Sequence, residues 1–86
     1  MKEQKLPPEY SKQAKKYLEN LDAKSQRRLK DGIEKIPLGD IKPYKSNPGY
    51  SRLRIGGYRI LFKWVNDTQL LVALIESRGQ AYKKGV

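Results

Sequence analysis

Two adjacent glycines in the segment SRLRIGGYRILFKW, residues 51–64, constrain this chain more than any other feature of its sequence. Strand-forming residues alternate with cations on both sides of Gly56 and Gly57. A Gly-Gly pair suits the positive φ angles that a two-residue hairpin loop requires. We therefore predict a β-hairpin whose strands cover residues 52–55 and 58–64.

A two-residue loop also fixes the register of the hairpin, because side chains alternate between the two faces of a strand. The opposed pairs are Ile55 with Tyr58, Arg54 with Arg59, Leu53 with Ile60, and Arg52 with Leu61. The apolar face then holds Leu53, Ile55, Tyr58, Ile60, Phe62 and Trp64. The cationic face holds Arg52, Arg54, Arg59 and Lys63. Opposed like charges disfavour a hairpin by about 0.2–1 kcal/mol, so their presence suggests that an anion binds there.

Two amphipathic helices are predicted before the hairpin, because apolar residues recur there with helical spacing. The first helix covers roughly residues 10–20, with the stripe Tyr10, Ala14, Tyr17, Leu18 and Leu21. The second is capped by Asp22 and carries the stripe Leu29, Ile33 and Ile36 before Pro37 stops it. Together they predict a helical hairpin that covers the apolar sheet face.

The remaining segments complete an α+β fold. Residues 37–50 hold three prolines and two glycines and are predicted to be a connector. A turn at Asn66–Asp67 leads to a third strand over residues 68–77, and residues 4–10 offer a poor edge strand because they contain Pro7 and Pro8. We predict an N-terminal helical hairpin packed on a small, mainly antiparallel, twisted sheet, in one domain spanning residues 1–86.

Composition restricts the chemistry and the cellular setting. The 86 residues include no cysteine and no histidine, so thiolate sites are excluded and the commonest metal ligand is missing; we expect no metal and no cofactor. The apolar run LLVALI at 70–75 is too short to span a bilayer, and no signal-peptide stretch follows the charged N-terminus. We expect a cytoplasmic protein that does not bind membranes.

The charge balance favours a polyanionic partner. A net charge of +10 and a pI near 9.9 make nucleic acid the leading hypothesis. The plainer interpretation is a small protein kept soluble by its lysines. In the hairpin, arginine predominates, and its planar fork matches phosphate oxygens, so we favour phosphate binding by Arg52, Arg54 and Arg59 over an ordinary polar sheet face.

The end of the last predicted strand carries three further candidates: Glu76, Arg78 and Tyr82. An aromatic ring there would stack on a nucleobase while arginines hold phosphates, as in proteins that bind single-stranded RNA. Alternatively, Glu76 only pairs with a neighbouring arginine and Tyr82 only packs against the fold.

The chain resembles the RelE/ParE superfamily of bacterial toxins over nearly its whole length, and more closely the RelE-type ribosome-dependent mRNA endonucleases. The resemblance is carried by YSKQAKKYLENLD at 10–22, RLRIGGYRILF at 52–62, and an arginine followed four residues later by a tyrosine. It implies a RelE-like fold. The hairpin motif is shared with the gyrase-directed relatives, so it defines the fold better than the activity.

The resemblance also assigns roles by position. The two basic residues before the turn match Arg52 and Arg54, where RelE has lysines, and the arginine after the turn matches Arg59. The arginine closing the last strand matches Arg78, and the base-stacking tyrosine matches Tyr82. Many relatives have a histidine where this chain has Ser77.

The implied reaction is metal-independent cleavage of mRNA in the ribosomal A site, by attack of a ribose 2′-hydroxyl on the adjacent phosphate. Positioned arginines align the phosphate and neutralise its charge, and Arg59 and Arg78 are the main candidates. Arginine stays protonated, so Glu76 is the candidate base, with Tyr82 an alternative. The implied partners are mRNA, bound by Arg52, Arg54, Lys63 and Tyr82, ribosomal RNA, and an acidic, partly disordered antitoxin protein. Two rival hypotheses are a ParE-like inhibitor of DNA gyrase and an RNA-binding module without catalysis.

Overall fold

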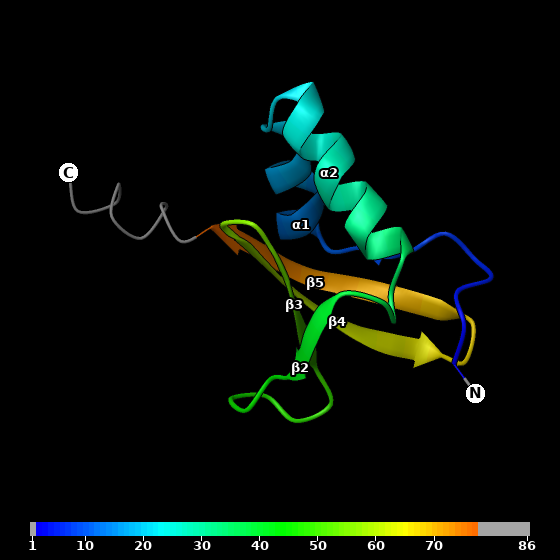
Figure 1. Ribbon diagram of the computed structural model, residues 1–86. Helices are drawn as coiled ribbons and strands as arrows, with labels where there is room; N and C mark the ends of the chain where they lie inside the picture. Colours follow the sequence, from blue (N-terminus) through cyan, green and yellow to red (C-terminus); the bar gives the residue numbers. More distant parts are fainter. Residues whose placement is uncertain (1, 78–86) are drawn as a thin grey trace.

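The computed structural model of the protein describes residues 2–77, in which two helices lie on one face of a five-stranded sheet (Figure 1). The helices are α1 (Lys12–Glu19) and α2 (Ala23–Glu34). The strands are β1 (Glu9–Tyr10), β2 (Asp40–Pro43), β3 (Ser51–Ile55), β4 (Tyr58–Asn66) and β5 (Gln69–Ser77). Their order across the sheet is β1-β5-β4-β3-β2, and all neighbours are antiparallel except β1 and β5. The predicted α+β class is confirmed.

Both helices begin at the caps that their sequences provide. The Ser11 hydroxyl accepts a hydrogen bond from the Ala14 N–H at 3.1 Å, and α1 starts one residue later. Asp22 caps α2 by accepting from the Ser25 N–H, and this hydrogen bonding lowers the pKa of Asp22. The first helix is shorter than predicted because Tyr10 belongs to β1 instead.

The core lies between the helices and the sheet. The stripes predicted for the two helices supply four of its fully or nearly fully buried side chains: Ala14, Leu18, Leu29 and Ile33. Ile36 is also buried, although α2 ends two residues before it. The Gln4 side-chain amide donates to the carbonyl oxygens of Ile33 and Ile36 at 2.9 and 3.0 Å, so the N-terminal segment satisfies carbonyls at the end of α2.

The central hairpin has the predicted register. Ile55 pairs with Tyr58, Arg54 with Arg59, Leu53 with Ile60, and Arg52 with Leu61. Gly56 has a φ of +57°, a backbone angle that residues with a side chain rarely adopt. A Cβ at this position would lie 2.9 Å from the guanidinium of Arg28. Glycine is therefore required here by the turn, whereas the exposed Arg28 side chain could move aside.

The second hairpin differs from its prediction by one residue. Asn66 pairs with Gln69, so the turn lies at Asp67–Thr68 and not at Asn66–Asp67. The Asn66 side-chain carbonyl accepts from the Thr68 N–H at 2.8 Å and from its hydroxyl at 2.9 Å. This Asx turn replaces the expected positive φ angles, which only glycines adopt among residues 2–77.

The connector predicted over residues 37–50 was partly wrong, because it contains β2. Gly39, with a φ of +122°, turns the chain after α2, and residues 40–43 then pair with β3. Pro43 is tolerated because it ends an edge strand. At the opposite edge, the predicted strand over residues 4–10 is reduced to Glu9–Tyr10, directly after the two prolines.

Within the described part of the chain, neither helix has the length and apolar character needed to cross a membrane.

Candidate nucleic-acid interface

The sheet face opposite the helices carries the cations of the central hairpin. Register partners share a face, so Arg52, Arg54, Arg59 and Lys63 project together, away from the buried face that contains Leu53 and Ile60. We call this surface the open face. The neighbouring strands extend it into three rows of side chains that run across the sheet.

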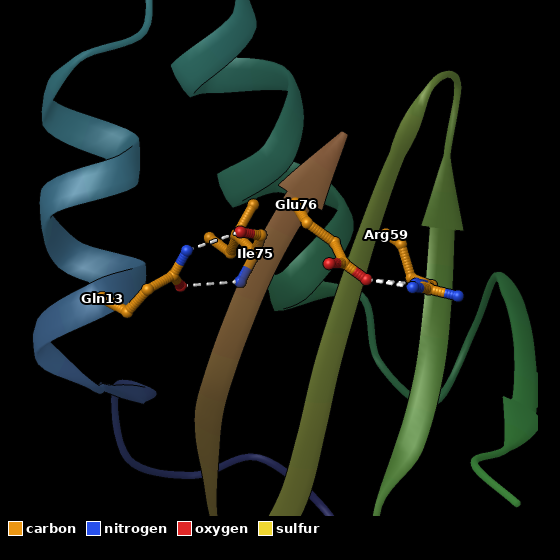
Figure 2. A network of polar contacts seen from close by, with 4 residues as sticks. All are labelled: Gln13, Arg59, Ile75 and Glu76. Carbon is orange, nitrogen blue, oxygen red and sulfur yellow. Dashed lines mark hydrogen bonds and ion pairs between the residues drawn. The ribbon is translucent and has the colours of Figure 1, made fainter. Parts of the chain in front are cut away.

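The first row, next to the Gly-Gly turn, has a carboxylate at each end and two arginines between them. Its members are Asp40, Arg54, Arg59 and Glu76. The Arg59 Nε–H donates to Glu76 Oε2 at 2.7 Å, and a terminal N–H of the same guanidinium donates to the same oxygen (Figure 2). Two carboxylates therefore flank the like-charged Arg54–Arg59 pair.

This flanking corrects the sequence argument, which noted only cations in the hairpin itself. The carboxylates come from β2 and β5, which are distant in sequence but adjacent in the sheet. The side chains of Arg59 and Glu76 are 44% and 35% exposed. Exposed ion pairs contribute about 0.2–1 kcal/mol, similar to the cost of an opposed pair of like charges. The repulsion is thus offset within the protein.

The second row contains no carboxylate of its own, although Asp40 of the first row pairs with Arg52. Its members are Lys42, Arg52, Leu61 and Leu74. Arg52 is only 12% exposed, and its terminal nitrogen Nη1 lies 3.9 Å from Asp40 Oδ2, which is an ion pair at a distance too long for a hydrogen bond. That nitrogen is buried and donates no hydrogen bond to any described residue. A buried donor without an acceptor is costly, so the Arg52 guanidinium would be stabilised by a further acceptor.

The third row combines two aromatic rings with a cation. Register extension places Tyr44, Tyr50, Lys63 and Leu71 in one line across the sheet. The Tyr44 N–H donates to the Tyr50 carbonyl at 2.9 Å, which continues the β2–β3 pairing beyond its last residues. Lys63 Nζ lies 5.3 Å from the centroid of the Tyr50 ring. Sequence reasoning missed both tyrosines, because they lie in the segment predicted to be a connector.

The structure thus brings together five of the predicted site residues: Arg52, Arg54, Arg59, Lys63 and Glu76. Arg78 and Tyr82 lie outside the described residues. The open face also contains a third carboxylate beside Asp40 and Glu76. Glu9 of β1 is the register partner of Leu71 of β5, which lies on the open face opposite Lys63.

Chemically, the open face suits a phosphate chain better than an uncharged ligand. Guanidinium groups can grip phosphate oxygens in two adjacent rows, and aromatic rings stand in the third. Glu76 is the acidic side chain on β5 that reaches this surface, and both of its contacts with Arg59 use Oε2. Its other oxygen, Oε1, is not engaged by Arg59.

Sequence comparison decides the family. The family model described as ParE toxin of type II toxin-antitoxin system, parDE, matches residues 9–82. The chain belongs to this toxin family. The match spans both helices and all five strands, so it includes every row of the open face of the toxin. A search of curated proteins finds no significant match.

Solved structures place the toxin in the RelE/ParE superfamily. One neighbour belongs to the RelB–RelE antitoxin–toxin complex from Methanococcus jannaschii, with a TM-score of 0.66, 25% identity, and coverage of 88% of this toxin and 96% of that chain. Another belongs to the RelBE2 toxin–antitoxin complex from Mycobacterium tuberculosis, with a TM-score of 0.66, 20% identity, and coverage of 85% and 100%. The second similarity concerns the fold alone.

Proposed function

We propose that this toxin is an mRNA interferase that cleaves mRNA in the ribosomal A site and thereby inhibits translation. The observation that carries the proposal is the second row of the open face. Arg52 has a buried nitrogen there without a hydrogen-bond acceptor, beside Lys42 and between rows that contain further cations. A sugar-phosphate chain would neutralise the surrounding charge, and it would supply the missing acceptor once the side chains that cover this nitrogen move aside.

The proposed reaction is attack of a ribose 2′-oxygen on the adjacent phosphorus, which forms a 2′,3′-cyclic phosphate. The P–O5′ bond breaks, and the 5′-oxygen takes a proton from water to leave as the 5′-hydroxyl of the downstream fragment. Arg52 and Arg54 hold the phosphate in line, while Arg59 neutralises the charge that develops on its oxygens. By resemblance, Arg78 assists Arg59 and Tyr82 stacks on an mRNA base.

Glu76 is our candidate for the base that removes the 2′-hydroxyl proton. Its contact with Arg59 fixes the carboxylate beside the group that would bind the phosphate, and Oε1 is left to accept a proton. Ser77 occupies the position where many relatives have a histidine, so this chain needs another group for the task.

Inhibition of DNA gyrase is the second candidate function. It is favoured by the family description, which is that of a ParE toxin, and by the charge balance of the first row. A gyrase inhibitor needs a stable basic surface but no group that transfers protons. Simple RNA binding without cleavage is the third possibility.

One set of assays separates the three functions. Added to a cell-free translation system, a ribosome-dependent nuclease leaves codon-spaced breaks in the mRNA, whereas a gyrase inhibitor blocks supercoiling of a plasmid and leaves the mRNA intact. A simple RNA-binding protein does neither. Arg52→Gln should abolish most of the mRNA cleavage, and Arg27→Gln, which removes the same charge from exposed helix α2, should not. Intact mRNA with the wild-type protein would refute the proposed function.

We also propose that a cognate antitoxin binds this toxin, since both structural neighbours belong to toxin–antitoxin complexes. The net charge of +10 suits an acidic, partly disordered partner that lies over the cations of the open face. Co-purification with the product of the adjacent reading frame is the direct test.

A further inference from the structure

We propose that Tyr50 is a nucleobase-binding residue, which holds a base of single-stranded RNA on its ring while Lys63 and Arg52 contact the flanking phosphates. This inference rests on the proposed RNA-directed function and extends it, because it adds a base-binding position immediately before β3 to a site otherwise made of charged groups.

The distribution of aromatic residues supports this assignment. Five of the aromatic side chains that the structure describes belong to or pack against the core: Tyr10, Tyr17, Tyr58, Phe62 and Trp64. Tyr44 and Tyr50 are the described aromatic residues outside that cluster. Both are half-buried, and both fall on the open face by the register of β2 and β3. Core packing therefore does not account for their rings.

The contact with Lys63 shows how the Tyr50 ring is presented. Its Nζ lies over the ring at 5.3 Å from the centroid, so a π face of Tyr50 is directed toward a cation of the open face. A ring that meets a cation through its face can also meet a nucleobase through it, since every base has a π face. When a base takes this place, the Lys63 ammonium is released to a phosphate oxygen.

Spacing links this position to the arginines. Tyr50 and Arg52 are alternate residues of one extended segment, so they project from the same face roughly 7 Å apart. Arg52 supplies the buried donor that has no acceptor. A base on Tyr50 thus places its own phosphate chain beside the group that needs an anionic oxygen. Sites for single-stranded nucleic acid combine aromatic rings that stack on bases with cationic side chains that contact the sugar-phosphate backbone.

The test uses the full chain and a short single-stranded RNA that contains 2-aminopurine, whose fluorescence is quenched when it stacks on a ring. Tyr50→Leu keeps an apolar side chain without the aromatic face, whereas Tyr50→Phe keeps the face. We expect quenching with the wild type and the Phe variant, loss of quenching with the Leu variant, and an affinity lower by about 5- to 150-fold for the Leu variant. Thermal melting of the variants confirms that each is folded.

Salt dependence distinguishes the base contact from the phosphate contacts. Tyr50→Leu should leave the slope of log affinity against log salt unchanged, and Lys63→Gln should reduce its magnitude by about 0.7. Equal affinities of the Leu and Phe variants, or no quenching with the wild type, would overturn the inference. A wild type that quenches through Tyr50 but leaves mRNA intact on ribosomes would support the inference and refute the proposed nuclease function instead.

Discussion

Replacing Glu76 by Gln separates the two roles that this side chain can have on the open face. The amide keeps the size of the carboxylate and can still accept a hydrogen bond from Arg59, but it cannot accept a proton from a ribose hydroxyl. If Glu76 is the base, the variant loses the proton-transfer contribution, which is about 10²–10⁴-fold in rate.

The same change acts on RNA binding in the opposite direction. The Arg59–Glu76 pair is half-exposed, so its loss costs about 0.2–1 kcal/mol of stability at most. In the variant, Arg59 no longer has to give up this ion pair when it binds a phosphate, so RNA affinity should rise by about 5-fold or less. Cleavage and binding are thus expected to change in opposite senses, and the effect on the rate should be the larger.

Single-turnover cleavage on translating ribosomes gives the rate, and titration with single-stranded RNA gives the affinity. Glu9→Gln is a matched control, because it removes a carboxylate from the open face at β1 without touching Arg59. An unchanged cleavage rate in the Glu76 variant would refute its assignment as the base. If the variant binds RNA more tightly but cleaves it at the wild-type rate, the only role of Glu76 on the open face is to neutralise the charge of Arg59.

Three further predictions concern the scaffold. Ser11→Ala removes the cap of α1 and a 2.7 Å hydrogen bond to the Ala73 carbonyl, so urea denaturation should give an unfolding free energy lower by about 2 kcal/mol; no loss would show that the hydroxyl has no net role. A Cβ at Gly32 would overlap Cδ1 of Ile55, so Gly32→Ala should leave the free energy of unfolding unchanged or lower it by up to about 2 kcal/mol, although alanine has the better helix propensity. Ile55→Val removes Cδ1, so in a double-mutant cycle it should recover about 1 kcal/mol of that loss. Strictly additive effects of the two mutations would contradict this packing. Burial raises the pKa of the Tyr10 hydroxyl above its usual value, so the folded state binds that proton more tightly than the unfolded state does. The resulting contribution to stability is complete below a pH of about 10 and is lost as the pH rises through the folded-state pKa. The melting temperature of Tyr10→Phe should therefore fall less steeply with alkaline pH than that of the wild type, and parallel curves would refute the assignment.

The central hairpin was predictable because its information is local. Gly56 and Gly57 fix both the loop length and the register, and all four predicted pairs occur. The helix stripes were equally local, and their residues lie in or against the core, although some of them, including Tyr10 and Ile36, fall outside the helices themselves. The second hairpin was misplaced by one residue because the Asn66 side chain accepts hydrogen bonds within its own turn.

The strand β2 escaped prediction because its pattern is too weak to signal a strand. It has four residues, of which Ile41 is the half-buried apolar one, and it ends at Pro43. Pairing with β3 stabilises it, and that pairing is a property of the tertiary fold. A pattern confined to so few positions cannot be separated from a loop by periodicity.

The candidate site was only partly predictable for the same reason. Its cations lie within one hairpin, but the groups that modify them come from other strands. Asp40 reaches Arg52 from β2 and Glu76 reaches Arg59 from β5, and neither contact can be inferred from spacing within residues 51–64. The sheet order supplies what the linear charge pattern lacks.

The helical layer contacts β5 one residue before the carboxylate that pairs with Arg59. The Gln13 side-chain amide both donates to the Ile75 carbonyl at 2.8 Å and accepts from the Ile75 N–H at 3.0 Å, so a side chain of α1 substitutes for a further strand at that edge (Figure 2). Both main-chain groups of Ile75 are thereby anchored, immediately ahead of Glu76. A helix on one face of the sheet thus fixes the main chain immediately before Glu76, and so helps to position the carboxylate that pairs with Arg59 on the opposite face.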